Sequence, residues 1–141
     1  MHAQETLAAG APEELRLDAV PLRADADSVA AFRRAIALGA DADPGADAVP
    51  ATYPFRWLTL PELRPALTRM MGAGVLPVHE GQSFAYERPL ASGADYVANF
   101  VFTRTHGPER LTVAAAISDL SGAPCASFEA VLRLVPVEGR P

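Results

Sequence analysis

The second half of the chain alternates between apolar and polar positions, which is the pattern of strands that bury one face. Residues 96–103, 111–117 and 126–134 each show this two-residue period. The segments between them, 106–109 and 119–122, contain the Gly, Pro, Asp and Ser that hairpin connections favour. With another strand entering near residue 79, the pattern predicts four long antiparallel strands in a meander, consecutive strands being neighbours.

The first half of the chain predicts a short strand and two helices. Residues 14–22 alternate up to Pro21 and indicate a first or edge strand. Asp27 is expected to cap a helix over 28–38, which Gly39 ends. Residues 39–51 then form a long loop without any period, and loops of that length commonly carry function.

The second helix is expected to begin near Thr59. Thr59 and Glu62 have the spacing of a capping box. Pro65 falls inside the helical pattern, where it removes a backbone hydrogen bond, so a kink or a later regular start is expected.

Composition narrows the class of protein. The chain has 141 residues, 50% of them hydrophobic, which predicts one domain over 14–137 after a mobile tail at 1–13. The net charge is -5 and the 12 positive charges are scattered arginines, which argues against nucleic acid as a partner. No apolar run approaches the roughly 18 residues of a membrane span, and residues 1–12 lack a signal core, so a soluble cytoplasmic protein is expected.

The chain's single cysteine, Cys125, excludes an internal disulfide and shows no metal-type spacing with the three histidines. Its place in an alternating strand predicts a small buried side chain. We expect neither a metal nor an organic cofactor.

The segment 76–90 carries a family resemblance. It reads Leu-Pro-Val-His-Glu-Gly-Gln-Ser-Phe-Ala-Tyr-Glu-Arg-Pro-Leu, and it resembles the His-Gly-Glu-Gln-x-Phe-x-Tyr-x-Arg-Pro-Leu stretch of the N-terminal-type domains of MaoC-like dehydratases. The order His79-Glu80-Gly81-Gln82 departs from that pattern. The resemblance implies an α+β single hotdog, in which an antiparallel sheet wraps around a central helix; a cone-shaped fold of the ketosteroid-isomerase type is the alternative.

A second segment departs from the same family in the residue that does the chemistry. Catalytic members carry Gly-Asp-x-Asn-Pro-x-His, whose aspartate and histidine manage the water that adds to or leaves the acyl chain. Here Asp41 and Pro44 match, whereas Ala46 occupies the histidine position. A methyl group cannot exchange a proton, so Asp41 is interpreted as vestigial and no catalytic residue is assigned.

The resemblance also suggests substrate-binding residues, each with a structural alternative. His79 would lie at a pocket mouth near a pantetheine arm or a neighbouring subunit, or it is a structural histidine bonded to backbone. Gln82 would bind a thioester carbonyl or hold a loop. Arg88 would contact a phosphate of CoA or of a carrier protein, or it pairs with Glu87 or Glu129.

Two further groups of side chains have alternative roles. Tyr53, Phe55 and Trp57 would line an acyl channel or belong to the core. Glu62 would activate water in a hotdog thioesterase, or it caps the helix.

The function that the resemblance implies is that of a catalytically degenerate, substrate-binding subunit of an (R)-specific enoyl-CoA hydratase or 3-hydroxyacyl-thioester dehydratase. Its ligand would be an acyl-CoA or acyl-carrier-protein thioester, bound in a homodimer or in a heterodimer with a catalytic MaoC-like subunit. The alternatives are an acyl-CoA thioesterase using Glu62, a self-sufficient dehydratase using His79, and a binding module without catalysis.

Overall fold

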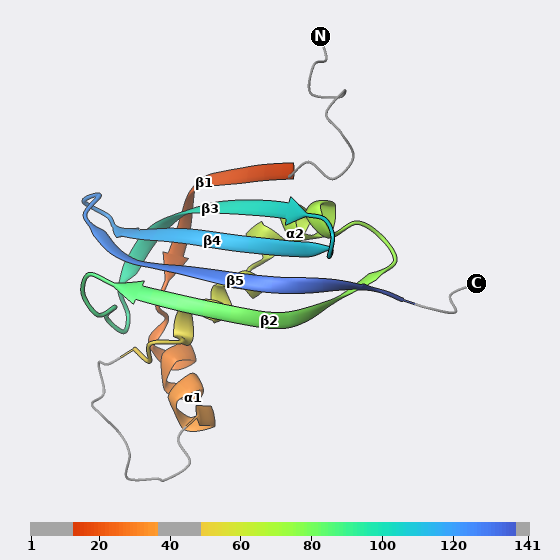
Figure 1. Ribbon diagram of the computed structural model, residues 1–141. Coiled ribbons are helices and arrows are strands. Elements are labelled where there is room, and N and C mark those ends of the chain that lie inside the picture. The colour runs from red at the N-terminus through yellow and green to blue at the C-terminus, as the bar shows by residue number, and fades with distance from the viewer. Residues whose placement is uncertain (1–12, 37–48, 138–141) are drawn as a thin grey trace.

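The computed structural model describes residues 13–36 and 49–137, which form one sheet and a helical layer (Figure 1). Along the chain the elements are β1 (Glu13–Arg23), α1 (Ala26–Ile36), the 3-10 helices η2 (Tyr53–Thr59) and η3 (Pro61–Leu63), α2 (Arg64–Met71), β2 (Val75–Tyr86), β3 (Asp95–Thr105), β4 (Arg110–Asp119) and β5 (Pro124–Pro136). The expected tail lies outside the described residues except for Glu13, which is already paired in β1.

The five strands form one antiparallel sheet in the order β1-β3-β4-β5-β2. The predicted hairpins β3–β4 and β4–β5 are confirmed. The four-strand meander is wrong, because β2 pairs with β5 and not with the next strand along the chain. The strand β1 pairs with the free edge of β3, where Leu17 is opposite Phe100. The strand β2 pairs with the free edge of β5 at the other side of the sheet.

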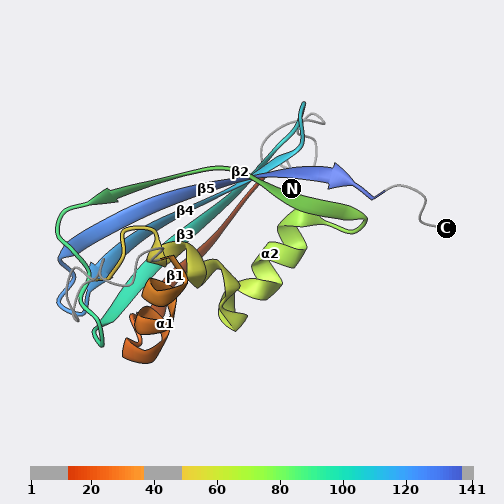
Figure 2. The ribbon, with the colours of Figure 1, turned by 90° about the horizontal axis from the view of Figure 1, so that it is seen from below.

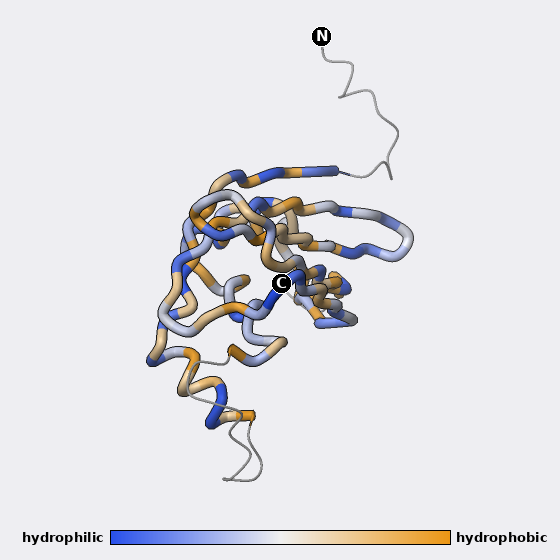
Figure 3. The backbone as a smooth tube through the Cα atoms, turned by 90° about the vertical axis from the view of Figure 1, so that its left-hand side faces the viewer, coloured by the Kyte–Doolittle hydropathy of each residue, from blue (hydrophilic) through white to orange (hydrophobic). Residues whose placement is uncertain are grey.

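Both helices cover the same side of the curved sheet (Figure 2). We call this side the inner face and the opposite side the outer face. Alternate residues of β3, β4 and β5 are buried in the core. Hydrophobic and hydrophilic residues are interspersed along the chain (Figure 3). The largest fully buried side chains include Phe100, Phe102, Leu63 and Leu111, so the core lies between the sheet and the helical layer. Cys125 is buried at 2% exposure, as its pattern predicts.

The start of α1 differs from the expectation by two residues. The helix begins at Ala26, and the carboxylate of Asp25, not Asp27, accepts a hydrogen bond of 2.9 Å from the Ser28 amide. Asp27 lies in the first turn, where its charge favours the helix dipole. The expected end of this helix at Gly39 lies outside the described residues.

The capping box at Thr59 is wrong. The Thr59 hydroxyl donates to the Arg56 carbonyl within η2, and no side chain caps η3 or α2. The regular α-helix starts only at Arg64, with Pro65 in its first turn, where the missing amide hydrogen costs nothing. The later start that Pro65 predicts is confirmed. Within the described residues, no helix has the length and apolar character needed to cross a membrane.

Candidate functional site

The candidate site lies on the inner side of the edge strand β2. His79 is opposite Leu132, and Gln82 is opposite the buried Ala130. A register shift between His79 and Gly81 inserts Glu80, which lets His79 and Gln82 both face the helical layer. Both side chains are nevertheless exposed, because β2 has no strand on its far side among the described elements. The structure therefore brings these two predicted site residues together at an open edge.

Phe55 of η2 forms the second wall of this site. Its ring lies 4.9 Å from the imidazole of His79, measured between centroids, with the planes tilted by 44°. Phe55 is half-buried and packs against the core, so its other side remains accessible. An aromatic ring beside a polar group at an open edge suits a ligand with an apolar chain and a polar carbonyl.

The inserted Glu80 leaves the site and binds two arginines. It accepts hydrogen bonds from Arg110 at 2.6 Å and from Arg133 at 3.3 Å. Arg110 and Arg133 are cross-strand partners on the outer face, alternating with the inward Leu111 and Leu134. The hydrogen bond from Arg110 is the main cause of a lowered pKa at Glu80. Glu80 is thereby held as a carboxylate on the opposite side from His79, where it cannot serve as its acid partner.

Tyr53 and Trp57 lie in the core, each 3% exposed. The Tyr53 hydroxyl donates to the Ser28 hydroxyl, and the Trp57 indole donates to the Arg23 carbonyl. These bonds attach η2 to β1 and α1. Of the three aromatics predicted to line an acyl channel, only Phe55 contacts His79.

Tyr86 is a site residue that the sequence reasoning did not single out. It follows Gln82 and Phe84 on the inner side of β2, and its hydroxyl donates to the carbonyl of Ala51. Burial raises the pKa of Tyr86 to about 12. The two-residue period from Gln82 was the available signal, since it places Phe84 and Tyr86 on the same face.

The remaining predicted residues lie away from this edge or outside the described residues. Arg88 pairs with Asp119 at 2.7 Å, so both carboxylates considered for it, Glu87 and Glu129, are wrong. Glu62 is exposed in η3 and has no hydrogen-bond partner among the described residues. Asp41, Pro44 and Ala46 fall outside the described residues.

The described residues of this site bring an imidazole, a carboxamide and an aromatic ring to one edge of the sheet. In the described part of the chain, no carboxylate forms a hydrogen bond with His79, which would orient its ring and raise its basicity. No group of three or more metal-ligating side chains occurs in residues 13–36 or 49–137. The arrangement can hold an apolar chain against Phe55 and a carbonyl near His79 and Gln82.

Comparisons with solved structures identify the fold. A chain of the C-terminally truncated HadBC (3R-hydroxyacyl-ACP dehydratase) complex from Mycobacterium tuberculosis has a TM-score of 0.62 at 14% identity, covering 86% of this chain and 95% of that one. HtdX from the same organism has a TM-score of 0.60 at 18% identity, with 90% of this chain covered. The match spans about half of HtdX, 51% of its chain.

A third similar structure is smu.793 from Streptococcus mutans bound to acetyl CoA, with a TM-score of 0.54 at 10% identity, covering 97% of this chain and 98% of that one. No family model matches the sequence, and no curated protein matches it. The fold is a hotdog of the α+β class: a five-stranded antiparallel sheet curved around a helical layer.

Proposed function

We propose that this chain is a catalytically degenerate MaoC-like hotdog that binds substrate for an (R)-specific enoyl-CoA hydratase or 3-hydroxyacyl-thioester dehydratase. The observation that supports it best is the half-built site on β2. Phe55, His79 and Gln82 converge there, but the site is open at the sheet edge. A second hotdog subunit placed against that edge would close the site and supply the groups that are missing.

The missing groups are an acid and a base within reach of the substrate. Ala46 stands where the resembling enzymes keep their histidine. His79 has no carboxylate partner in the described part of the chain, and Glu80 is held by Arg110 on the other side of the strand. Hydration needs a proton moved to or from water by a positioned titratable group. We therefore assign that step to the partner subunit.

Each residue of the half-site has a role in this proposal. The ring of Phe55 forms an apolar wall for the acyl chain. The Gln82 amide donates a hydrogen bond to the thioester carbonyl, and His79 lies beside it to orient the pantetheine arm. Tyr53 and Trp57 act indirectly by fixing η2, because their polar atoms are bonded inside the core.

The edge of β2 suits an additional strand from another subunit. Edge strands present unpaired backbone groups that bind a further strand. Leu76 and Val78 on this strand are 57% and 44% exposed, which is high for large apolar side chains. The HadBC similarity supports a heterodimer, since that structure is a complex. The carrier is an acyl-CoA or acyl-carrier-protein thioester, and a structure with acetyl CoA bound is among the similar folds.

The proposal is tested by mixing the chain with a catalytic MaoC-like subunit. A suitable subunit is encoded by a neighbouring reading frame and has an intact Gly-Asp-x-Asn-Pro-x-His loop. Hydration of crotonyl-CoA and longer enoyl-CoAs is measured for each protein and for the mixture. The expected result is a gain in kcat/KM for the longer substrates. No gain over the catalytic subunit alone contradicts the proposal.

Gln82→Ala in this chain gives the sharper form of the same test. It should raise KM in the mixture by about fivefold while leaving kcat nearly unchanged, as expected for a lost ground-state hydrogen bond. Ser83→Ala is the matched control, because Ser83 is the next residue and faces the outer side. Equal effects of both variants would count against a substrate contact by Gln82.

A further inference from the structure

The outer face of the sheet is unusual for a surface in contact with water. Antiparallel sheets with one solvated side normally place charged or long polar residues there. In the middle of this face, on β3 and β4, the side chains are small and uncharged: Val101, Thr103, Thr112, Ala114 and Ala116. Such a face has the composition of a buried layer, yet no described helix covers it.

These small residues leave a hollow of about 670 Å³ on the outer face. Ala114 and Ala116 of β4 line it, together with residues 83–85 of β2, and its charged lining residues are Arg16 of β1 and Glu129 of β5. The hollow is separate from the β2 half-site, because His79 and Gln82 face the inner side.

The two charges at the rim lie on one line across the strands. Arg16 is opposite Val101 of β3. Val101 is opposite Ala114 of β4, and Ala114 is opposite Glu129 of β5. Arg16 and Glu129 are therefore at equal height, separated by two strands with no charge in between.

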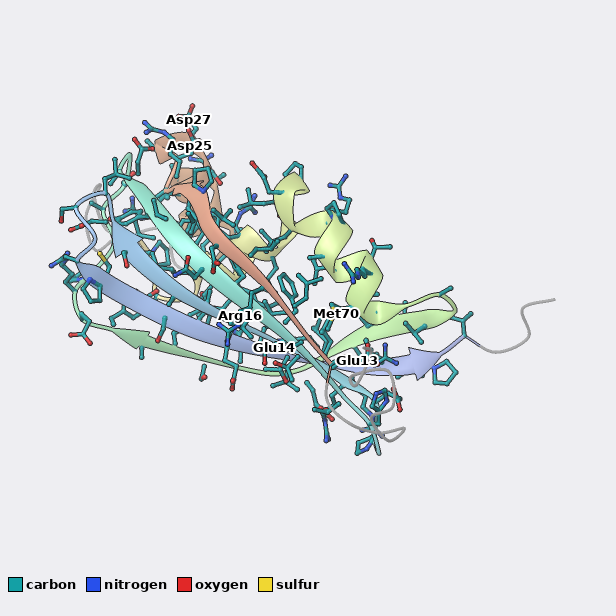
Figure 4. All side chains as sticks on the ribbon, turned by 90° about the horizontal axis from the view of Figure 1, so that it is seen from above. Glu13, Glu14, Arg16, Asp25, Asp27 and Met70 are labelled. Atoms are coloured by element: carbon teal, nitrogen blue, oxygen red, sulfur yellow. The ribbon has the colours of Figure 1, made fainter. Side chains whose placement is uncertain are left out.

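Neither rim charge is buried or locked in a network. Arg16 is 63% exposed and, among the residues that the structure describes, pairs with Glu14 of its own strand at 2.8 Å. Figure 4 shows the side chains of Arg16 and Glu14 on the opposite side of β1 from α2. Glu129 is exposed and has no ion-pair or hydrogen-bond partner within the described residues.

A two-fold rotation makes this face complementary to itself. We place the axis parallel to the strands, midway between β3 and β4. The strand β1 of one copy then lies over β5 of the other, and β3 lies over β4. Arg16 of each copy then meets Glu129 of the other, so one operation forms two ion pairs around an uncharged centre.

We propose that the outer face is an interface between two copies of this chain, packed sheet to sheet. Four overlapping strands of ten residues would bury about 600 Å² per copy, or roughly 1,200 Å² in all, which reaches the range of specific interfaces. The strand β2 lies beyond the overlap, so its edge stays free. The contact is therefore independent of the partner proposed for the half-site.

Charge reversal tests the interface in the full-length protein. Sedimentation velocity and native mass spectrometry measure the mass of the assembly and the dissociation constant of the sheet-to-sheet contact. Arg16→Glu and Glu129→Arg should each raise that constant by about tenfold or more, and the double variant should restore it. Ala116→Arg, which places bulk and charge in the hollow, should also halve the mass.

Matched controls come from the pair Arg23–Asp95 on the neighbouring ends of β1 and β3. These residues form a 2.8 Å ion pair at similar exposure but lie outside the hollow. Arg23→Glu and Asp95→Arg should leave the mass unchanged. The proposal is overturned if the parent protein forms no dimer that Arg16→Glu weakens. It is also overturned if the double variant does not recover the dissociation constant of the parent protein.

Discussion

The ring of Phe55 lies against the imidazole of His79, with centroids 4.9 Å apart. Phe55 belongs to the helical layer and His79 to the edge strand, so this pair joins the two layers where the sheet is open. His79 consequently has a packing role whatever its chemistry. A substitution that keeps a ring but removes the nitrogens separates packing from polar recognition.

His79→Phe should retain the contact with Phe55 and change the melting temperature little. In the complex with a catalytic subunit it should raise KM for enoyl-CoA by about threefold to tenfold, since a lost hydrogen bond to a ligand is worth about 1 kcal/mol. Steady-state kinetics measure this. An unchanged KM would show that His79 only packs.

Arg104 should be the most sensitive polar residue for stability. Its side chain is 16% exposed and donates to the carbonyls of Met70 and Met71 at the end of α2, and to Glu109. Arg104→Leu leaves these acceptors without their donor and should lower the free energy of unfolding by about 2–3 kcal/mol. Urea unfolding measures this.

Arg104→Lys serves as the companion variant, because one ammonium cannot reach all three acceptors and should recover only part of the loss. Equal stability of the leucine variant and the parent protein would rule out this anchoring of α2 by β3.

Position 19 should favour glycine over the alanine that occupies it. Its φ is 56°, in the left-handed region, at a register shift of β1, and its amide donates to the Asn99 side chain at 2.8 Å. Ala19→Gly should raise the free energy of unfolding by up to about 1 kcal/mol, because it relieves the strain of a Cβ at this φ.

Ala85→Gly is the matched control, since Ala85 lies in regular strand β2 and is exposed. There glycine should destabilise by about 0.5–1 kcal/mol. The same sign at both positions, measured by urea unfolding, would contradict the strained geometry at Ala19.

Tyr86 should make stability depend on alkaline pH. Burial raises its pKa from 10.0 to about 12, so the unfolded chain ionises first as the pH rises. The protonated Tyr86 hydroxyl therefore contributes fully to the free energy of unfolding below pH 10. This contribution is lost as the pH rises toward about 12. Unfolding of Tyr86→Phe should show a flatter dependence across this range. Identical slopes for parent and variant would show that the Tyr86 hydroxyl is not buried.

The strands of the second half could be predicted from sequence because their signals are local. Alternation places Phe100 and Phe102 in the core, and the hairpin residues beside them fix which strands are adjacent. The neighbour of β2 could not be predicted in this way. That strand is exposed along most of its length and bulges at Glu80, so its pattern shows a strand but not which edge it fills.

The site was predicted only in part, because some of its contacts depend on distant residues rather than on local sequence signals. The resemblance in 76–90 identified His79 and Gln82, and the structure places both on one side of β2. Their contact with Phe55 depends on the path of η2, which Tyr53 and Trp57 fix through hydrogen bonds to distant residues. Thr59 misled the prediction because its hydroxyl binds a carbonyl in its own turn rather than capping the next helix.

The alternative of a thioesterase has its own measurement. If Glu62 activated water, the chain alone would release thiol from acyl-CoA, and Glu62→Gln would abolish that release. We expect no release from either protein, because Glu62 lies on η3 without a partner that would orient it within the described residues.

The most direct measurement is hydration of crotonyl-CoA by the purified chain alone, followed by loss of enoyl-thioester absorbance, with acyl-CoA binding measured in parallel. A substrate-binding subunit whose histidine position holds Ala46 should bind acyl-CoA but hydrate it no faster than buffer. Turnover by the isolated chain that His79→Ala abolishes would contradict this and identify a self-sufficient enzyme.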